Sequence, residues 1–291
     1  MSRLRLNQRL RLNADKVAKD DPTKTFQLRQ RAVAEINRRF AKIRKAVREA
    51  VLVGGLVTNA VSPGQFEYTR DANKIPEFNA WLQNEIDREI LGIANGTIPA
   101  PEDHWLNVYV GDAYERGAKK TRAYAERNIN SLDSLPDYHP LGNPFHMERA
   151  ELIFQRVYSD LKGVTEVMSS QISRELANGM MRGLNPKEVA ENMADRVDKI
   201  GITRARLIAR TEIVESHNRA SLNEAEELEE ETGVAIKMQW VTSMDGRERP
   251  SHAARHLKIY PRDEASNMLG EPNCRCSISA YIDIDEILKS S

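Results

Sequence analysis

Apolar residues recur at helical spacing over long stretches of this chain. Between residues 25 and 52, side chains such as Phe26 and Phe40 return every three or four positions, while Arg and Lys fill the opposite side. The pattern predicts one amphipathic helix of about 28 residues, and Gly54-Gly55 follows as its stop signal. A chain that opens with such a helix is constrained to bury one long apolar stripe.

The same period continues through most of the chain and changes only near the end. Residues 234–241 and 274–282 alternate apolar and polar side chains with a period of two, so they are predicted as paired antiparallel strands. The predicted fold class is α+β and predominantly α-helical, with long N-terminal helices before a C-terminal domain of helices plus a small antiparallel hairpin. Further helices are predicted over residues 76–95, 102–129, 147–179, 186–197 and 203–231.

The formal net charge is zero, but the charge is unevenly distributed. Residues 1–50 hold 15 Lys and Arg against 5 Asp and Glu. Such an excess indicates either an acidic partner, nucleic acid or protein, or a solvated basic face. The candidate binding residues are Arg3, Arg5, Arg9, Arg11, Arg38, Arg39, Lys42 and Lys45.

Composition also suggests domain boundaries. Residues 1–20 are predicted as a basic flexible arm, 21–145 as a helical N-terminal region and 146–291 as a C-terminal domain, because residues 130–147 are rich in Pro and lack an apolar period. No apolar run approaches the roughly 18 residues that span a bilayer. We therefore expect no membrane partner, and a protein made in a cytoplasm or packed into a particle assembled there.

The only two cysteines stand one residue apart, at Cys274 and Cys276. In a strand their sulfurs would share a face, and two thiols fit half of a tetrahedral zinc site. His252 and His256 would supply the other half, because a helix opened by Pro250 places both on one side. Two alternatives stay open: small buried thiols in the core, or a nucleophilic cysteine paired with His252.

Two further polar groups surround these residues. Asp245-Gly246 predicts a tight turn, and Arg247 and Arg249 beside it favour an internal ion-pair network over a phosphate site. On the helix over 203–231, Thr211 and Asn218 share a face and are expected to reach toward the hairpin. The acidic run over 224–231 is predicted as an exposed face.

Taken together, the spaced motifs resemble the C-terminal domain of the phage Mu F-like head morphogenesis family, over roughly residues 150–283. After His252 this chain departs from the family pattern, because Ala253-Ala254-Arg255 replaces a Leu-x-Gly-like turn; His256 therefore lies outside the pattern. The residues that carry the resemblance are Arg210, Thr211, Glu212, Asn218, Asp245, Arg247, His252, Cys274 and Cys276.

The resemblance implies a minor head protein of a tailed bacteriophage, located in the capsid interior or at the portal vertex. Its implied partners are the portal protein, packaged double-stranded DNA, and scaffolding or major capsid protein. It implies no enzymatic activity, and zinc would be structural. The alternative is a metal-dependent hydrolase or nuclease centred on His252, Cys274 and Cys276.

Overall fold

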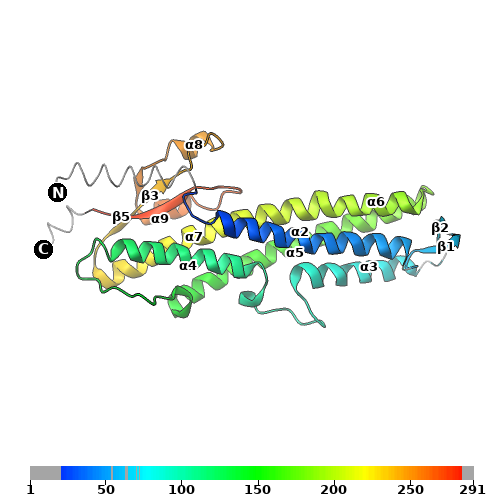
Figure 1. Ribbon diagram of the computed structural model, residues 1–291, viewed down its shortest axis with the longest axis horizontal. Helices are drawn as coiled ribbons and strands as arrows, with labels where there is room; N and C mark the ends of the chain where they lie inside the picture. The colour runs from blue at the N-terminus through cyan, green and yellow to red at the C-terminus, as the bar shows by residue number, and fades with distance from the viewer. Residues whose placement is uncertain (1–20, 54, 63–64, 70, 72, 284–291) are drawn as a thin grey trace. The chain divides into compact units, whose positions relative to one another are not determined.

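The computed structural model describes residues 21–53, 55–62, 65–69, 71 and 73–283. It confirms the predicted fold class, a predominantly helical chain with small antiparallel sheets. None of the described helices is long and apolar enough to cross a membrane. The α-helices are α2 (Phe26–Leu52), α3 (Lys74–Ile86), α4 (Asn107–Ala125), α5 (Pro144–Met181), α6 (Pro186–Arg196), α7 (Thr203–Thr232), α8 (Pro250–Ala253) and α9 (Arg262–Asn267) (Figure 1).

By their contacts, the described residues group into two compact units. Residues 21–30, 106–154 and 210–283 form one, which we call the sheet unit, and residues 31–105 and 155–209 form the other, the helical unit. Three of the four boundaries between the units fall inside α2, α5 and α7, and the fourth lies just before α4. The predicted functional division at residue 146 stays a prediction, because the units are defined by packing alone.

In the helical unit, the predicted amphipathic helix is confirmed as α2. Ile36, Phe40 and Val47 are fully buried along one side of it. A Cβ atom added at Gly201 would lie 2.2 Å from the Phe40 ring, so α2 packs closely on the turn that precedes α7. The unit also contains an antiparallel strand pair, β1 (Thr58–Ser62) and β2 (Gln65–Tyr68).

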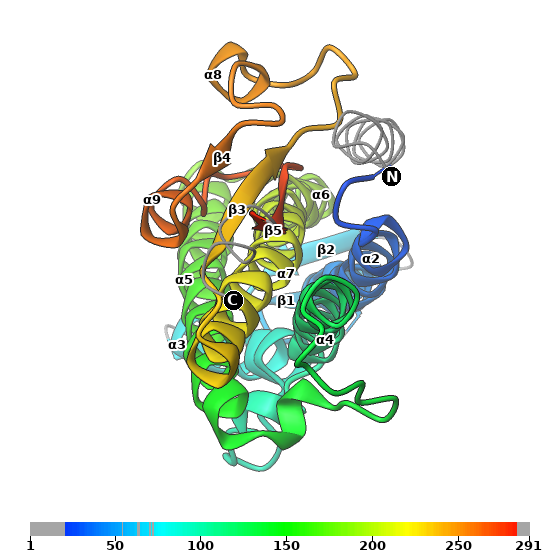
Figure 2. The same cartoon turned by 90° about the vertical axis from the view of Figure 1, so that its left-hand side faces the viewer.

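The sheet unit holds three antiparallel strands in the order β4-β3-β5 (Figure 2). The predicted pair is confirmed as β3 (Ile236–Val241) and β5 (Ser277–Ile282), in a register that sets Trp240 opposite Ile278. The strand β4 (Ile259–Tyr260) was not predicted, since two residues are too few for a detectable alternation.

The cysteines lie outside β5, although the sequence placed them at the start of that strand. Asn273 has a positive φ of 57°, and the N–H of Cys274 donates to the carbonyl of Glu271, so the chain is still turning there. The strand begins only at Ser277. The prediction of cysteines within the strand is therefore wrong, because the turn that follows Pro272 overrides the alternating pattern.

The core of the sheet unit lies between the sheet and helices α4 and α7. Met238, Trp240 and Ile278 of the sheet are fully buried against Leu228 of α7 and Ala125 of α4. The two helices are held together by serine hydroxyl groups that donate to backbone carbonyls across the contact. These hydrogen bonds run from Ser216 to Val110 (2.9 Å) and from Ser221 to Gly117 (3.2 Å).

Gly117 is where α4 and α7 come closest. A Cβ atom there would stand 2.0 Å from the carbonyl oxygen of His217 and 3.1 Å from the Cβ of Ala220. The nearest obstructing atoms belong to the backbone of His217, which cannot rotate aside as a side chain can. The approach therefore requires glycine at residue 117.

We expect Gly117→Ala to lower the free energy of unfolding by about 2–3 kcal/mol, because the added methyl forces the two helices apart. Gly163→Ala is the matched control, since Gly163 lies inside α5 and an added Cβ meets nothing within 4 Å. That change should be neutral or stabilise by up to about 1 kcal/mol. Urea unfolding of both variants measures the difference, and equal midpoints would contradict the close approach.

Candidate functional site

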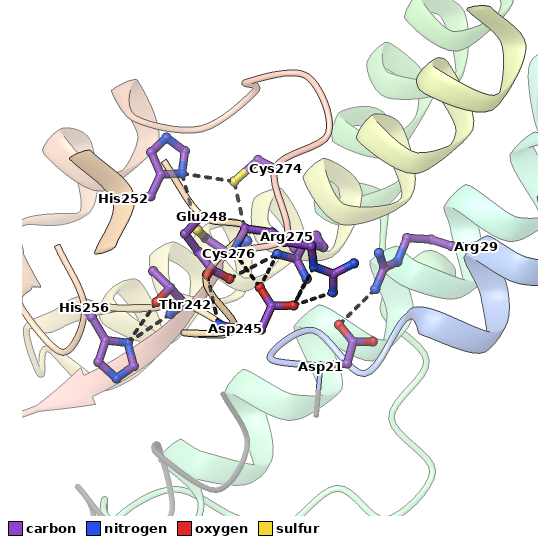
Figure 3. Close-up of polar contacts among 11 residues, drawn as sticks. Asp21, Arg29, Thr242, Asp245, Glu248, His252, His256, Cys274, Arg275 and Cys276 are labelled. Atoms are coloured by element: carbon purple, nitrogen blue, oxygen red, sulfur yellow. Dashed lines mark hydrogen bonds and ion pairs between the residues drawn. The ribbon is translucent and has the colours of Figure 1, made fainter. Parts of the chain in front are cut away.

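The pairing of β3 with β5 brings His252 and the two cysteines together. The chain leaves β3 at Val241, turns, and forms the single-turn helix α8, which carries His252. The cysteines sit on the segment that leads into β5, the neighbour of β3 in the sheet. In Figure 3 the imidazole of His252 points toward both sulfurs.

The three side chains form a compact group that could hold a metal ion. His252 Nδ1 lies 3.4 Å from Cys276 Sγ and 3.5 Å from Cys274 Sγ, and all three candidate ligand atoms lie within 4.8 Å of one another. On the other side of the ring, Nε2 lies 2.9 Å from the Glu271 carboxylate. A carboxylate that orients the second nitrogen of a histidine is the usual outer partner of a metal-bound imidazole.

The two thiols are electrostatically unequal. Their mutual hydrogen bond lowers the pKa of Cys274 to about 6, with further help from the Cys276 N–H and His252, and against the opposing effect of burial. The same hydrogen bond and burial raise the pKa of Cys276. The thiol of Cys274 is therefore the more acidic of the two.

His256 lies outside this group. Helix α8 ends at Ala253, so His256 is not on the same helical face as His252. Its Nδ1 accepts the backbone N–H of Thr242 at 3.1 Å, in the separate position seen in Figure 3. The structure thus brings together three of the four predicted ligands.

The residues of the Asp245 turn form ion pairs with one another and with the cysteine segment. Asp245 receives the guanidinium groups of Arg275 and Arg247, which lower the pKa of its carboxyl group, Arg275 most strongly. Arg275 also reaches Glu248 at 3.2 Å. The geometry matches the predicted internal network, since Asp245 forms ion pairs with both Arg247 and Arg275.

Two of the motif residues on helix α7 form hydrogen bonds to the backbone of the cysteine segment. The carboxamide of Asn218 donates to the carbonyl of Cys276 at 3.0 Å and accepts the N–H of Ile278 at 3.2 Å. Thr211 accepts the N–H of Asn273 at 3.1 Å. The prediction that both side chains reach the hairpin is confirmed. Of the other motif residues on α7, Glu212 is buried and Arg210 is exposed.

The predicted basic surface divides into two parts. Arg3, Arg5, Arg9 and Arg11 lie outside the described residues. The other four form ion pairs within the chain: Arg38 and Arg39 with Glu35, Lys42 with Glu89, and Lys45 with Glu49.

The acidic run contains one residue that the sequence misplaced. The side chain of Glu224 is fully buried, and that of Glu227 is only 22 % exposed. Both lie against His146, which belongs to the Pro-rich stretch 130–147. The prediction of an exposed face is wrong here. A signal was present, because Glu224 stands three residues after Ser221 and four before Leu228, on the buried stripe of α7.

Comparison with known proteins gives one result that bears on this site. Residues 170–279 match a family model, Phage Mu protein F like protein. The match confirms the resemblance predicted from the spaced motifs, and its span includes every motif residue from Arg210 to Cys276. No curated protein and no solved structure matches the chain.

We expect Asn218→Ala to lower the free energy of unfolding by about 2–4 kcal/mol, because two buried backbone groups lose their partner at once. Asn267→Ala, at the exposed end of α9, is the control and should change it by less than about 0.5 kcal/mol. Chemical denaturation measures both. An Asn218→Ala variant as stable as the control would show that the strand edge does not depend on this side chain.

Proposed function

We propose that this chain is a minor head protein of a tailed bacteriophage, assembled in the bacterial cytoplasm and retained in the capsid interior or at the portal vertex. The observation that carries the proposal is the family match over residues 170–279. The polar groups around the cysteines support a structural role for the sheet unit, because they are engaged with one another rather than directed at a vacant cleft.

The basic N-terminal residues are the part of the chain best suited to an acidic partner. In α2 the four candidate cations already have carboxylate partners, so binding phosphate there would require breaking ion pairs. We therefore assign the contact to Arg3, Arg5, Arg9 and Arg11. Their partner would be the portal protein or packaged double-stranded DNA, and scaffolding or major capsid protein would be met during assembly.

Changing these four arginines together to Gln tests the assignment. The variant should lose co-purification with a co-expressed portal protein, or lose DNA binding with a salt dependence reduced by about 3–4 in logarithmic slope. The control removes three charges from α2, Arg38→Gln with Lys42→Gln and Lys45→Gln, and should retain binding. Retention of both partners by the arm variant would contradict the assignment.

We further propose that His252, Cys274 and Cys276 hold a structural zinc ion. The buried indole N–H of Trp240 has no hydrogen-bond partner, and it acts to lower the pKa of Cys276 against the larger effects of Cys274 and burial. A donor directed at a thiolate, together with the Glu271–His252 contact, is typical of the surroundings of a zinc-bound thiolate.

Elemental analysis of protein purified under reducing conditions tests this site. Cys274→Ser should hold one zinc ion fewer per chain and melt at a lower temperature, and Glu271→Gln should bind zinc at this site about 10–100-fold more weakly because the imidazole loses its orienting partner. His256→Gln is the control and should keep its zinc, since His256 lies outside the group. Equal zinc affinity in Glu271→Gln and the control would count against the site.

The alternative function is a metal-dependent hydrolase or nuclease at the same residues. Three protein ligands with one open position are the pattern of catalytic zinc, and the exclusion of His256 leaves three. Zinc-loaded protein would then hydrolyse a nucleic acid or ester substrate, and Cys274→Ser would abolish turnover while His256→Gln retained it. Absence of turnover in protein with a full zinc complement favours the structural role.

A further inference from the structure

A second polar cluster is buried in the sheet unit, on the part of α7 that follows Asn218. It is formed by Tyr138, by His146 in the first turn of α5, and by Glu224 and Glu227 on α7. The side chains of His146 and Glu224 are fully buried. Neither the family motifs nor the proposed function uses these residues.

Four donor atoms of this cluster converge on one point. His146 Nε2 lies 3.0 Å from an oxygen of Glu224, 3.0 Å from an oxygen of Glu227 and 3.0 Å from the hydroxyl of Tyr138. The Tyr138 hydroxyl lies 2.5 Å and 3.5 Å from the same two carboxylate oxygens. These separations bracket the edge of about 3.3 Å expected for four ligands around a zinc ion at about 2.0 Å.

The remaining polar atoms of the ligands are held from outside. The second oxygen of Glu224 accepts from Arg122 Nε at 2.7 Å, and that of Glu227 accepts from the amide of Asn143. His146 Nδ1 lies 3.0 Å from the hydroxyl of Tyr114, which also accepts from Asn223 at 2.8 Å. The outer atoms of each ligand are therefore fixed by neighbours, as in the outer shell of a metal site, while the inner atoms face one another.

The charges of the cluster balance only when His146 carries a proton or a further cation is bound. Two carboxylates meet a single guanidinium, that of Arg122, which is also shared with the partly exposed Glu231. Tyr138 adds no positive charge, because a phenol is neutral or negative. One positive charge is needed to offset the second carboxylate, that of the partly buried Glu227.

We propose that His146, Glu224 and Glu227 bind a zinc ion, with the hydroxyl of Tyr138 next to the fourth position. One imidazole and two carboxylates form a recognised zinc ligand set. The ion would tie the first turn of α5 to the C-terminal third of α7. This site is separate from the His252, Cys274 and Cys276 group and does not depend on the phage role.

Zinc stoichiometry of the full chain tests the proposal through two neighbouring isosteric changes. Glu227→Gln removes a ligand charge, and Glu226→Gln removes the same charge one residue away, where the side chain lies 3.6 Å from Arg149 and outside the cluster. Glu227→Gln should hold one zinc ion fewer per chain than Glu226→Gln, and chelator competition should show at least a 10-fold weaker site.

Cobalt substitution identifies the site that has been lost. The charge-transfer band of thiolate-bound cobalt should be the same in Glu227→Gln and Glu226→Gln, because the cysteines are untouched. Equal zinc content in the two variants overturns the proposal. It is also overturned if saturating zinc leaves the melting temperature of Glu226→Gln and Glu227→Gln shifted by the same amount, since a proton on His146 would then balance the cluster.

Discussion

The two hydrogen bonds of the Asn218 carboxamide connect helix α7 to the sheet. They join the middle of α7 to the carbonyl of Cys276, just before β5, and to the N–H of Ile278 on the outer edge of β5. Because these groups face away from β3, the sheet cannot satisfy them itself. One side chain thus fixes the end of the strand, the turn that carries both cysteines, and the distance from those cysteines to His252.

Helix α7 serves the sheet unit through side chains of several kinds. Its serines donate hydrogen bonds to backbone carbonyls of α4, and Gly117 of α4 allows the two backbones to come into contact. Thr211 accepts a hydrogen bond from the turn at Asn273. Further along, Glu224 and Glu227 reach the segment that leads into α5. A helix with this many polar contacts on its buried side has little of the simple amphipathic pattern that identifies α2, because its inward face is polar as well as apolar.

The uneven charge suggests a binding surface in a chain of zero net charge. The basic residues of α2 and of the turn around Asp245 nevertheless meet carboxylates of the same chain. Exposed pairs of this kind contribute little to stability, typically below about 1 kcal/mol. Around Asp245 the pairs join the turn that follows β3 to Arg275, the residue between the two cysteines.

The sequence by itself determined the long helices, the main strand pair and the resemblance to the phage Mu F-like family. Helical spacing over 25–52, the period-two strands and the spaced motifs from Arg210 to Cys276 are local patterns, and local patterns can be read along the chain. Tertiary structure decided which side chains meet. The sequence placed the cysteines in a strand, whereas a turn at Asn273 keeps them outside it. It placed His256 beside His252, whereas α8 ends at Ala253 and leaves His256 elsewhere. It likewise assigned Glu224 to solvent. Only the tertiary structure places the imidazole of His146 and the guanidinium of Arg122 against the buried carboxylate of Glu224.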